Sequence, residues 1–397
     1  MSILYLIEQG ACLRKASRRL IVEKDGVTLM EIPSFQVSSI LIFGSVQITT
    51  QAINYLLDNG IDIGFLSQTG HLRGRLVSVA SKNIFLRLAQ YECSRNPEQK
   101  LELAKRFIRG KLTNQKTLLL RYQRNHTEVD FSKELDTLSQ LIPSISQKKT
   151  VDSLMGVEGA GSGAYFRGYG RMIIGEFSFE QRRMHPSPDP VNALLSLGYT
   201  LMTNELASLA EAVGFDPFIG FLHGLRYGRQ SLPLDLVEEF RHPVVDMLTL
   251  NLLNKRVLSP KDFVQQENKG MYLTKDGLKK YLTAYEKRMA KTFVDKIGGS
   301  GGGEGVGGAG GGGAGGRGAG GGGVGGGGVG GGGDVKDEGR ASGSEDCERE
   351  SESGSGTIDG DGSGNGSTNF REYFKRQISQ LQRALLYKEE YTPFCVQ

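Results

Sequence analysis

The residues best suited to metal chemistry lie in the stretch DPFIGFLHGLRYGRQSLPLDLVEEFRH, residues 216–242. It contains His223 and, further on, Asp235 and Glu238. If LPLDLVEEF is helical, the two acidic residues stand three apart on one face and can reach the same point. An imidazole followed by such a pair makes half of a divalent-metal site. The alternative is an acidic helix face turned to solvent, and this stretch alone leaves both interpretations open.

A third candidate ligand, Glu158, lies upstream in VDSLMGVEGAGSGAYFRGYG, where it ends an apolar helical pattern. The small residues that follow it let another backbone, or a phosphate, come close. Tyr165 and Arg167 then offer an aromatic face and a planar cation. The run GAGSG lacks the Lys-Ser ending of a phosphate-binding loop, which argues against nucleotide binding here.

Between these two regions, the segment RRMHPSPDPVNALL contains His185. We expect His185 to lie in a loop beside prolines, which makes it a weak candidate ligand. Asp189 fits best as the cap of a helix that starts at Pro190. The rigid, Pro-rich entry fixes the start of that helix.

With 397 residues, the chain is long enough to form two domains of ordinary size. It has no apolar run of about 18 residues and no N-terminal signal pattern. We therefore expect a soluble, cytoplasmic protein that does not enter a membrane. The four cysteines are scattered without CxxC spacing, which argues against a disulfide framework and against a thiolate zinc site.

Charge is unevenly distributed along the chain. Residues 298–368 contain 11 acidic and 4 basic side chains, a net of −7. The remaining residues contain 33 acidic and 44 basic side chains, a net of +11. A basic body of this kind favours a polyanionic partner such as nucleic acid, although many soluble proteins share the property.

Residues 1–83 have the pattern of a small β-rich domain. Short apolar runs such as ILYLI, SSILIFG and IDIGFLS alternate with turn residues, and the pair Asp25-Gly26 marks a hairpin. The segment TQAINYLLDNG, which ends at Gly60, predicts a short helix among these strands.

Residues 84–297 change to helical periodicity, with apolar residues at three- and four-residue spacings over most of their length. We therefore expect a mainly α-helical second domain and an α+β fold. The cationic side chains of its first long helical stretch fit a solvent-exposed face first and a nucleic-acid surface second. They are Lys105, Arg106, Arg109, Lys111, Lys116, Arg121 and Arg124.

Residues 298–368 interrupt this pattern. Of the 36 residues from 298 to 333, 27 are glycine, and the remainder of the segment is acidic and rich in Ser and Gly. Such a composition cannot bury enough apolar area to offset the entropy of ordering, so we expect a disordered insert. In residues 369–397, an apolar stripe predicts a helix that needs a core to cover. We expect this helix and the tail after it to complete the helical domain.

Four segments in this order resemble one family: GVEGAGSGAYF, HPSPDPVNALLSLGYTLMTNEL, GFDPFIGFLHGLRYGRQSLPLDLVEEFRHPVVDMLTL and YLTKDGLKKYLTAYEKRM. They are similar to the CRISPR-associated spacer integrases of the Cas1 family. The C-terminal FREYFKRQISQLQRALL, followed by YTPFCV, resembles the closing segment of that family. The likeness covers nearly the whole chain outside the insert, which is not part of the family pattern.

The resemblance implies a β-rich N-terminal domain that forms a homodimer and a helical domain that holds one Mg²⁺ or Mn²⁺ ion. It also implies a complex with the small partner Cas2 that inserts prespacer DNA into a CRISPR repeat. By motif, the family's metal ligands fall on Glu158, His223 and Glu238, while Asp235 matches an additional acidic position near the metal. Some members have Asp in place of Glu238, and which of the two acidic residues is the principal ligand stays open.

The reaction that this resemblance implies is attack of a 3′-hydroxyl on a backbone phosphodiester. Arg226, Arg229 and Arg167 are then candidates for contacts with DNA phosphates, and Tyr165 for positioning DNA near the metal. The alternative is that these residues only pack against their neighbours or lie on the surface without contacting DNA. Two other functions compete with the integrase: a metal-dependent endonuclease, in which water replaces the hydroxyl, and a non-catalytic DNA-binding scaffold.

Overall fold

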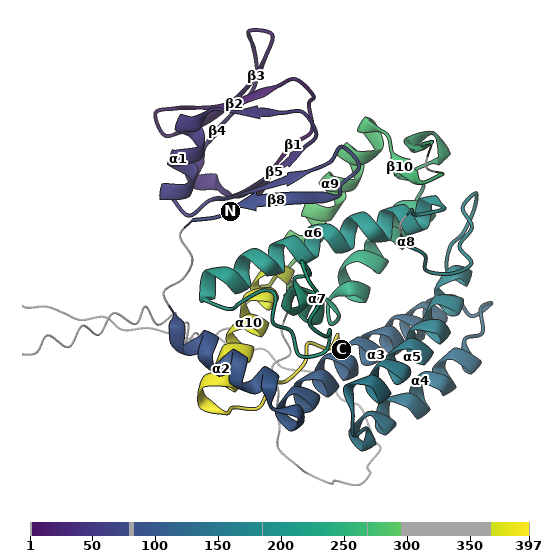
Figure 1. The fold of residues 1–397 in the computed structure, drawn as a ribbon. Helices are drawn as coiled ribbons and strands as arrows, with labels where there is room; N and C mark the ends of the chain where they lie inside the picture. The colour runs from purple at the N-terminus through teal and green to yellow at the C-terminus, as the bar shows by residue number, and fades with distance from the viewer. Residues whose placement is uncertain (1, 79–82, 185, 268, 295–366, 397) are drawn as a thin grey trace, which may run out of the picture. The chain divides into compact units, whose positions relative to one another are not determined.

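The structure, a computed structural model, describes residues 2–78, 83–184, 186–267, 269–294 and 367–396. His185 and almost all of the expected insert lie outside the described residues. Figure 1 shows strands in the N-terminal part and helices through most of the rest, so the α+β prediction is confirmed. Among the described helices, none is both long and apolar enough to cross a bilayer.

Two four-stranded sheets build the N-terminal part. Their strands are β1 Ser2–Leu6, β2 Cys12–Ala16, β3 Arg19–Lys24, β4 Val27–Pro33, β5 Val37–Phe43, β6 Gln47–Ile48, β7 Asp62–Leu66 and β8 Leu72–Leu76. One sheet has the order β1-β5-β7-β8, with only β8 antiparallel to its neighbour. The other has the order β4-β3-β2-β6, with only β6 parallel to its neighbour. Asp25 and Gly26 form the β3–β4 turn with positive φ angles of 50° and 77°, as a tight hairpin requires.

The apolar run in β5 is buried on both faces of its sheet. Ile40 and Ile42 belong to the core between the two sheets, whereas Leu41 and Phe43 belong to the core shared with the helices. Because side chains alternate along a strand, a continuous apolar run fits a strand that is covered on both sides. The short helix α1, Thr50–Asp58, packs against β2.

Helices make up most of the remaining chain. They are α2 Ile84–Arg95, α3 Pro97–Asn125, α4 Ser132–Ser144, α5 Val151–Arg171, α6 Pro190–Val213, α7 Ser231–Val237, α8 Met247–Asn254, α9 Lys275–Ala290 and α10 Phe370–Tyr387. The expected caps are present, because Asp189 accepts the N–H of Asn192 and Thr274 accepts that of Gly277. A π-helical segment, Arg241–Asp246, precedes α8, and a hairpin of β9, Phe263–Gln265, and β10, Met271–Leu273, precedes α9.

The chain after residue 366 returns to the helical core. β11, Phe293–Val294, and β12, Ser367–Thr368, form an antiparallel pair, so the last two residues of the expected insert belong to a strand. α10 then packs against α2, α6 and α9. Its Arg371 lies 2.8 Å from Glu205 and 2.7 Å from Glu286, which ties α10 to both α6 and α9. The apolar stripe that it buries is Phe370, Phe374, Ile378, Leu381 and Leu385.

Candidate metal centre

Small residues bring α5 against α3 and set Glu158 beside that helix. A Cβ added at Gly161 would lie 2.5 Å from Leu112 Cδ2, so the close approach requires glycine. The small residues after Glu158 lie inside α5, where they permit helix packing and do not end the helix. The Glu158 side chain is 18% exposed, which leaves it accessible from solvent at the edge of this contact.

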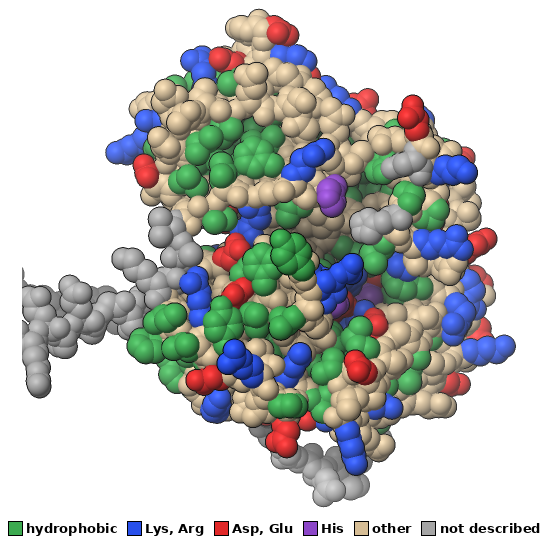
Figure 2. All heavy atoms as spheres, viewed as in Figure 1, with side chains coloured by type: hydrophobic (Ala, Val, Ile, Leu, Met, Phe, Trp, Pro, Cys, Tyr) green, Lys and Arg blue, Asp and Glu red, His purple; other side chains and the backbone are tan. Residues whose placement is uncertain are grey.

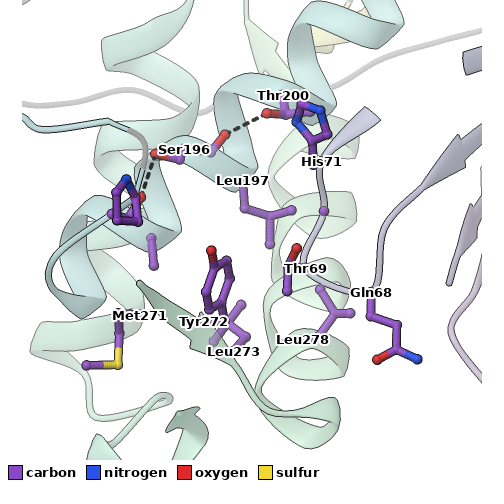
Figure 3. A pocket seen from close by; sticks show the side chains of 14 residues that line it. Gln68, Thr69, His71, Ser196, Leu197, Thr200, Met271, Tyr272, Leu273 and Leu278 are labelled. Carbon is purple, nitrogen blue, oxygen red and sulfur yellow. Dashed lines mark hydrogen bonds between the residues drawn. The ribbon is translucent and has the colours of Figure 1, made fainter. Parts of the chain in front are cut away.

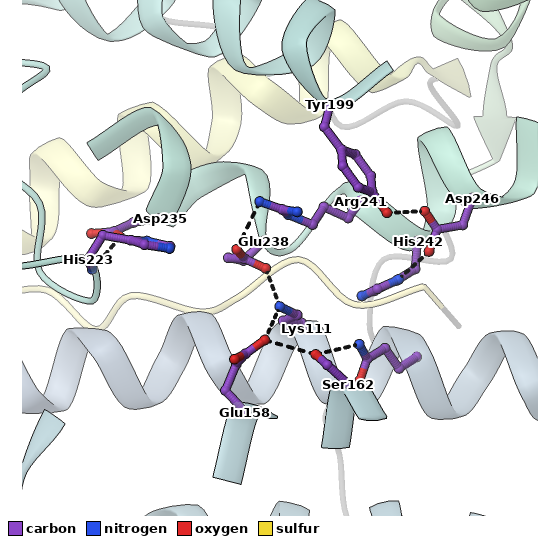
Figure 4. A network of polar contacts seen from close by, with 11 residues as sticks. Lys111, Glu158, Ser162, Tyr199, His223, Asp235, Glu238, Arg241, His242 and Asp246 are labelled. Carbon is purple, nitrogen blue, oxygen red and sulfur yellow. Dashed lines mark hydrogen bonds and ion pairs between the residues drawn. The ribbon is translucent and has the colours of Figure 1, made fainter. Parts of the chain in front are cut away.

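Lys111 of α3 is the cation around which the candidate centre is built. Its Nζ contacts Glu158 Oε1 and lies 2.7 Å from Glu238 Oε2, so two carboxylates from distant segments converge on one atom (Figure 4). Its side chain is only 8% exposed, and the expectation of a solvent-exposed face is wrong for this residue. Burial alone would lower the pKa of Lys111, but the charges of Glu238 and Glu158 outweigh burial and raise the pKa. The ammonium therefore stays charged.

Glu238 follows directly after α7 and is almost completely buried. Its Oε1 lies 3.2 Å from Arg241 Nη2, which supplies a second cation. Burial raises the pKa of Glu238, but Arg241, Lys111 and His223 together lower the pKa to about 2. Within the described part of the chain, Oε2 accepts no well-oriented hydrogen bond, although it forms the ion pair with Lys111. This ionised oxygen therefore has capacity for a further cationic partner.

His223 lies in the loop before α7 and is oriented by Asp235. Asp235 Oδ1 accepts hydrogen bonds from the His223 ring Nδ1 at 2.7 Å and from the His223 backbone N–H at 2.9 Å. Asp235 Oδ2 accepts from the N–H groups of Phe221 and Leu222 at 2.6 and 3.0 Å. Because Nδ1 donates to the carboxylate, Nε2 is the ring nitrogen with a lone pair for a metal. Figure 4 shows the ring directed from Asp235 toward Glu238.

Asp235 and Glu238 do not reach the same point, in contrast to the expectation from their spacing. α7 ends at Val237, and a tight turn follows. Asp235 is fully buried against the loop that carries His223, whereas Glu238 turns toward α3. The two carboxylates thus have different tasks: Asp235 orients the imidazole, and Glu238 faces the cation.

The side chains at this centre fit a divalent cation by chemical type. Two carboxylates and one imidazole are suitable ligands for Mg²⁺ or Mn²⁺, and Glu158, Glu238 and His223 are the residues that would hold the ion. Across the described ranges, no three His, Cys, Asp or Glu side chains form a ready-made metal cluster. At this centre, the ammonium of Lys111 lies between the two glutamates.

A second polar network is centred on Asp246, at the end of the π-helical segment that follows Glu238. Asp246 accepts hydrogen bonds from His242 Nδ1 at 2.6 Å, from the Tyr165 hydroxyl at 2.7 Å and from the Tyr199 hydroxyl at 2.5 Å. Arg241 lies over the Tyr199 ring, 4.5 Å from its centroid. The network therefore holds the guanidinium of Arg241 in its position facing Glu238. Tyr165 is fully buried within it, which corrects the expectation that its side chain positions DNA.

The arginines expected to contact DNA lie in different surroundings. Arg167 on α5 and Arg226 in the loop after His223 are exposed, so both are available to phosphate groups. Arg229 is half-buried and donates to the Gly224 carbonyl, which holds the loop in shape. Tyr227, between the last two arginines, is fully exposed.

Sequence reasoning did not place Lys111 between the two glutamates and did not single out Arg241. The missed signal at Lys111 is its place on the apolar stripe of α3. It stands four residues after Phe107, three after Ile108 and seven before Leu118, all of which are buried. A lysine on such a stripe must be paired, because a buried ammonium without a partner is very costly.

A separate pocket with a volume of about 260 Å³ lies away from these carboxylates (Figure 3). Its polar lining comes from Gln68, Thr69, His71, Ser187, Ser196, Thr200 and Tyr272. None of the described lining residues is Asp, Glu, Lys or Arg, so the pocket offers hydrogen bonds without a paired acid and base.

The space-filling view shows that Lys and Arg side chains are spread widely over the visible face, with acidic groups among them (Figure 2).

Fold and centre together define a class of protein: a β-rich N-terminal part is followed by a helical part in which two glutamates meet at a buried lysine and a nearby histidine is oriented by an aspartate. A sequence model of the family described as CRISPR associated protein Cas1 matches residues 4–287. A Rhodospirillum rubrum protein named CRISPR-associated endonuclease Cas1 2 is 35% identical over 72% of this chain and 86% of its own length. This chain belongs to the Cas1 family, which confirms the resemblance seen in its motifs.

Solved structures show the same fold. A Cas1 protein from Thermotoga maritima is 28% identical, with a TM-score of 0.64 over 72% of this chain and 90% of that one. A casposase bound to integration product is 20% identical, with a TM-score of 0.73 over 99% of this chain and 92% of that one. At that identity the second likeness concerns the fold alone.

Proposed function

We propose that this chain is a metal-dependent DNA integrase of CRISPR adaptation, which inserts prespacer DNA into a CRISPR array by transesterification. The observation that carries the proposal is the convergence of Glu158 and Glu238 on one buried cation, beside an imidazole held by Asp235. Family membership supports phosphodiester chemistry, since the curated relative from Rhodospirillum rubrum is named an endonuclease.

In the proposed reaction, a 3′-hydroxyl of the prespacer attacks a phosphodiester of the array. One P–O bond forms to the attacking oxygen, and the bond from phosphorus to the 3′ oxygen of the array breaks. The proton lost by the attacking hydroxyl is balanced by the proton that the leaving oxygen gains. When held by Glu158, His223 and Glu238, Mg²⁺ or Mn²⁺ supplies Lewis-acid stabilisation of the negative charge on the phosphate.

The chain's own residues prepare this chemistry. Asp235 keeps the His223 ring in one tautomer and one orientation. Arg241 keeps Glu238 ionised and in place. The exposed Arg226 and Arg167 contact backbone phosphates and set the register of the DNA, since such contacts position a duplex without specifying sequence.

The proposed partners are DNA, a second copy of the chain and the small protein Cas2. The second copy has support in the structure, because β4 lies at the edge of its sheet and carries apolar side chains that face solvent. Val27, Leu29 and Met30 are 62%, 50% and 46% exposed. An exposed apolar edge strand is a surface that a soluble protein covers with a partner.

The deciding experiment is integration into a supercoiled plasmid that carries a CRISPR array, with Cas2 and Mn²⁺ present. We expect strand joining by the wild type and none by the His223→Ala variant, while His126→Ala serves as a matched control on the surface of the same protein. Cleavage without joining would favour the endonuclease function. Joining by His223→Ala with the same metal dependence would refute the catalytic assignment and leave the scaffold.

A further inference from the structure

The ammonium of Lys111 lies where the two carboxylates proposed to hold the metal converge. It contacts Glu158 Oε1, lies 2.7 Å from Glu238 Oε2, and is shielded from solvent on a side chain that is 8% exposed. Lysine is rare in such a buried position unless it is paired, so the two glutamates and the lysine form one electrostatic unit.

We propose that Lys111 is a built-in competitor of the divalent metal, whose ammonium fills the cation's place until the metal displaces it. This inference rests on the proposed function, because it takes Glu158 and Glu238 as metal-holding residues. It assigns Lys111 the task of holding the two carboxylates together in the metal-free protein. Lys111 then sets how tightly the metal binds.

The first argument is that each glutamate has a second partner independent of Lys111. The hydroxyl of Ser162 donates to Glu158 Oε1 at 2.8 Å, and Arg241 lies 3.2 Å from Glu238 Oε1. When the ammonium leaves, both carboxylates therefore keep an anchor. The centre is able to exchange one cation for another without losing the positions of its ligands.

The second argument is charge balance. Lys111 and Arg241 together offset the charges of Glu158 and Glu238. A divalent ion beside a retained ammonium would leave excess positive charge in a buried, low-dielectric site, which is unfavourable. The four-carbon stem of lysine is flexible, so the ammonium is able to turn away from an incoming ion.

The third argument concerns DNA. An ammonium displaced from the carboxylates needs a new anionic partner, and a backbone phosphate at the active site provides one. DNA therefore favours the displaced position of Lys111 and strengthens metal binding. By linkage, metal strengthens DNA binding by the same factor. A lysine that serves only as a fixed ion pair would produce no such coupling.

The test measures the Mn²⁺ dissociation constant by isothermal titration calorimetry, without DNA, for the wild type and for Lys111→Met. We expect Lys111→Met to bind Mn²⁺ at least about tenfold more tightly, because no ammonium has to be displaced. Lys105→Met is the matched control: Lys105 is on the same helix and pairs with Glu102 at 2.7 Å. Its affinity should equal that of the wild type. Adding Glu158→Gln to Lys111→Met should remove the binding and so locate it.

A second arm repeats the titration with a branched DNA. The wild type should gain Mn²⁺ affinity when DNA is present, and Lys111→Met should gain much less. Equal or weaker Mn²⁺ binding by Lys111→Met without DNA would overturn the inference about Lys111 and leave the metal site intact. Absence of Mn²⁺ binding in every variant would overturn the metal site and this inference together.

Folding is followed by thermal melting in EDTA and in Mn²⁺. Lys111→Met should melt at a lower temperature in EDTA, because two carboxylates then face each other without their shared cation. It should recover more with Mn²⁺ than the wild type does. Lys111→Gln, which keeps a hydrogen-bond donor, repeats the titration if Lys111→Met does not fold in EDTA. Tighter Mn²⁺ binding by Lys111→Gln than by the wild type would then support the inference, and equal or weaker binding would overturn it.

Discussion

Asp235 holds His223 at two points: its Oδ1 accepts from the ring Nδ1 at 2.7 Å and from the backbone N–H at 2.9 Å. The same carboxylate accepts two further backbone N–H groups of this loop through Oδ2. A fully buried aspartate thus fixes both the position of the loop and the orientation of the ring. The direction in which the imidazole faces is therefore set by Asp235.

Asp235→Asn is expected to lower strand joining about 10- to 100-fold, the range found when a group that orients a metal-binding histidine is changed. The asparagine amide would turn N–H groups toward the N–H donors of the loop or of the ring. The ¹⁵N shifts of the His223 ring should then show loss of the Nδ1-protonated tautomer. An unchanged tautomer, with activity lost, would contradict the orienting role.

Glu239, next to Glu238, predicts a pH dependence of stability. It is fully buried and accepts hydrogen bonds from Tyr391, Gln377 and the Phe394 N–H. Two of these partners, Tyr391 and Phe394, belong to the C-terminal tail, so Glu239 holds the tail in place. Burial raises the pKa of Glu239 to about 8, against the effect of these hydrogen bonds. Between pH 4.5 and 8, the folded protein therefore binds more protons than the unfolded chain, and the free energy of unfolding falls as pH rises.

Glu239→Gln removes this titration and keeps hydrogen-bond partners for the surrounding groups. The amide oxygen accepts from Gln377 and the Phe394 N–H, and the Tyr391 hydroxyl accepts from the amide N–H. We expect urea unfolding to show the wild type losing a few kcal/mol relative to Glu239→Gln between pH 5 and pH 8.5, at about 1.4 kcal/mol per pKa unit. Parallel stability curves for the two proteins would refute the prediction.

The β11–β12 pair predicts that the chain between Val294 and Ser367 is dispensable for folding. Antiparallel pairing places these two residues side by side, so an Asn-Gly turn is long enough to replace residues 295–366. The melting temperature should change by less than about 5 °C, the effect of roughly 1 kcal/mol. Truncation before Ser367 is the contrasting variant and should unfold the protein, because it removes the apolar stripe of α10.

The exposed edge strand β4 predicts the oligomeric state. Leu29→Lys with Met30→Lys places two charges on the edge strand and should halve the mass measured by light scattering, without loss of secondary structure. Val264→Lys on β9, where the native side chain is 45% exposed, is the matched control and should leave the mass unchanged. A dimer that survives the double substitution would place the interface elsewhere.

The sequence by itself determined the class of fold, several element boundaries and the family. Asp189 before Pro190, Thr274 and the Asp25-Gly26 turn act through neighbouring backbone atoms, so their effects are visible in local sequence. The apolar run of β5 is also a local pattern that indicates a strand, whereas its burial on both faces became visible only in the structure.

Only the tertiary structure decided how the centre is assembled. Lys111 was expected on a solvated helix face and Tyr165 near DNA, yet both are buried with partners 47 and 81 residues away in the chain. Spacing placed Asp235 and Glu238 on one face, whereas the end of α7 directs them to different partners. The physical reason is that burial and charge pairing depend on which helices pack together. That packing depends in turn on contacts such as the one between Gly161 and Leu112. The sequence around Gly161 shows a small residue but does not show which residue will pack against it.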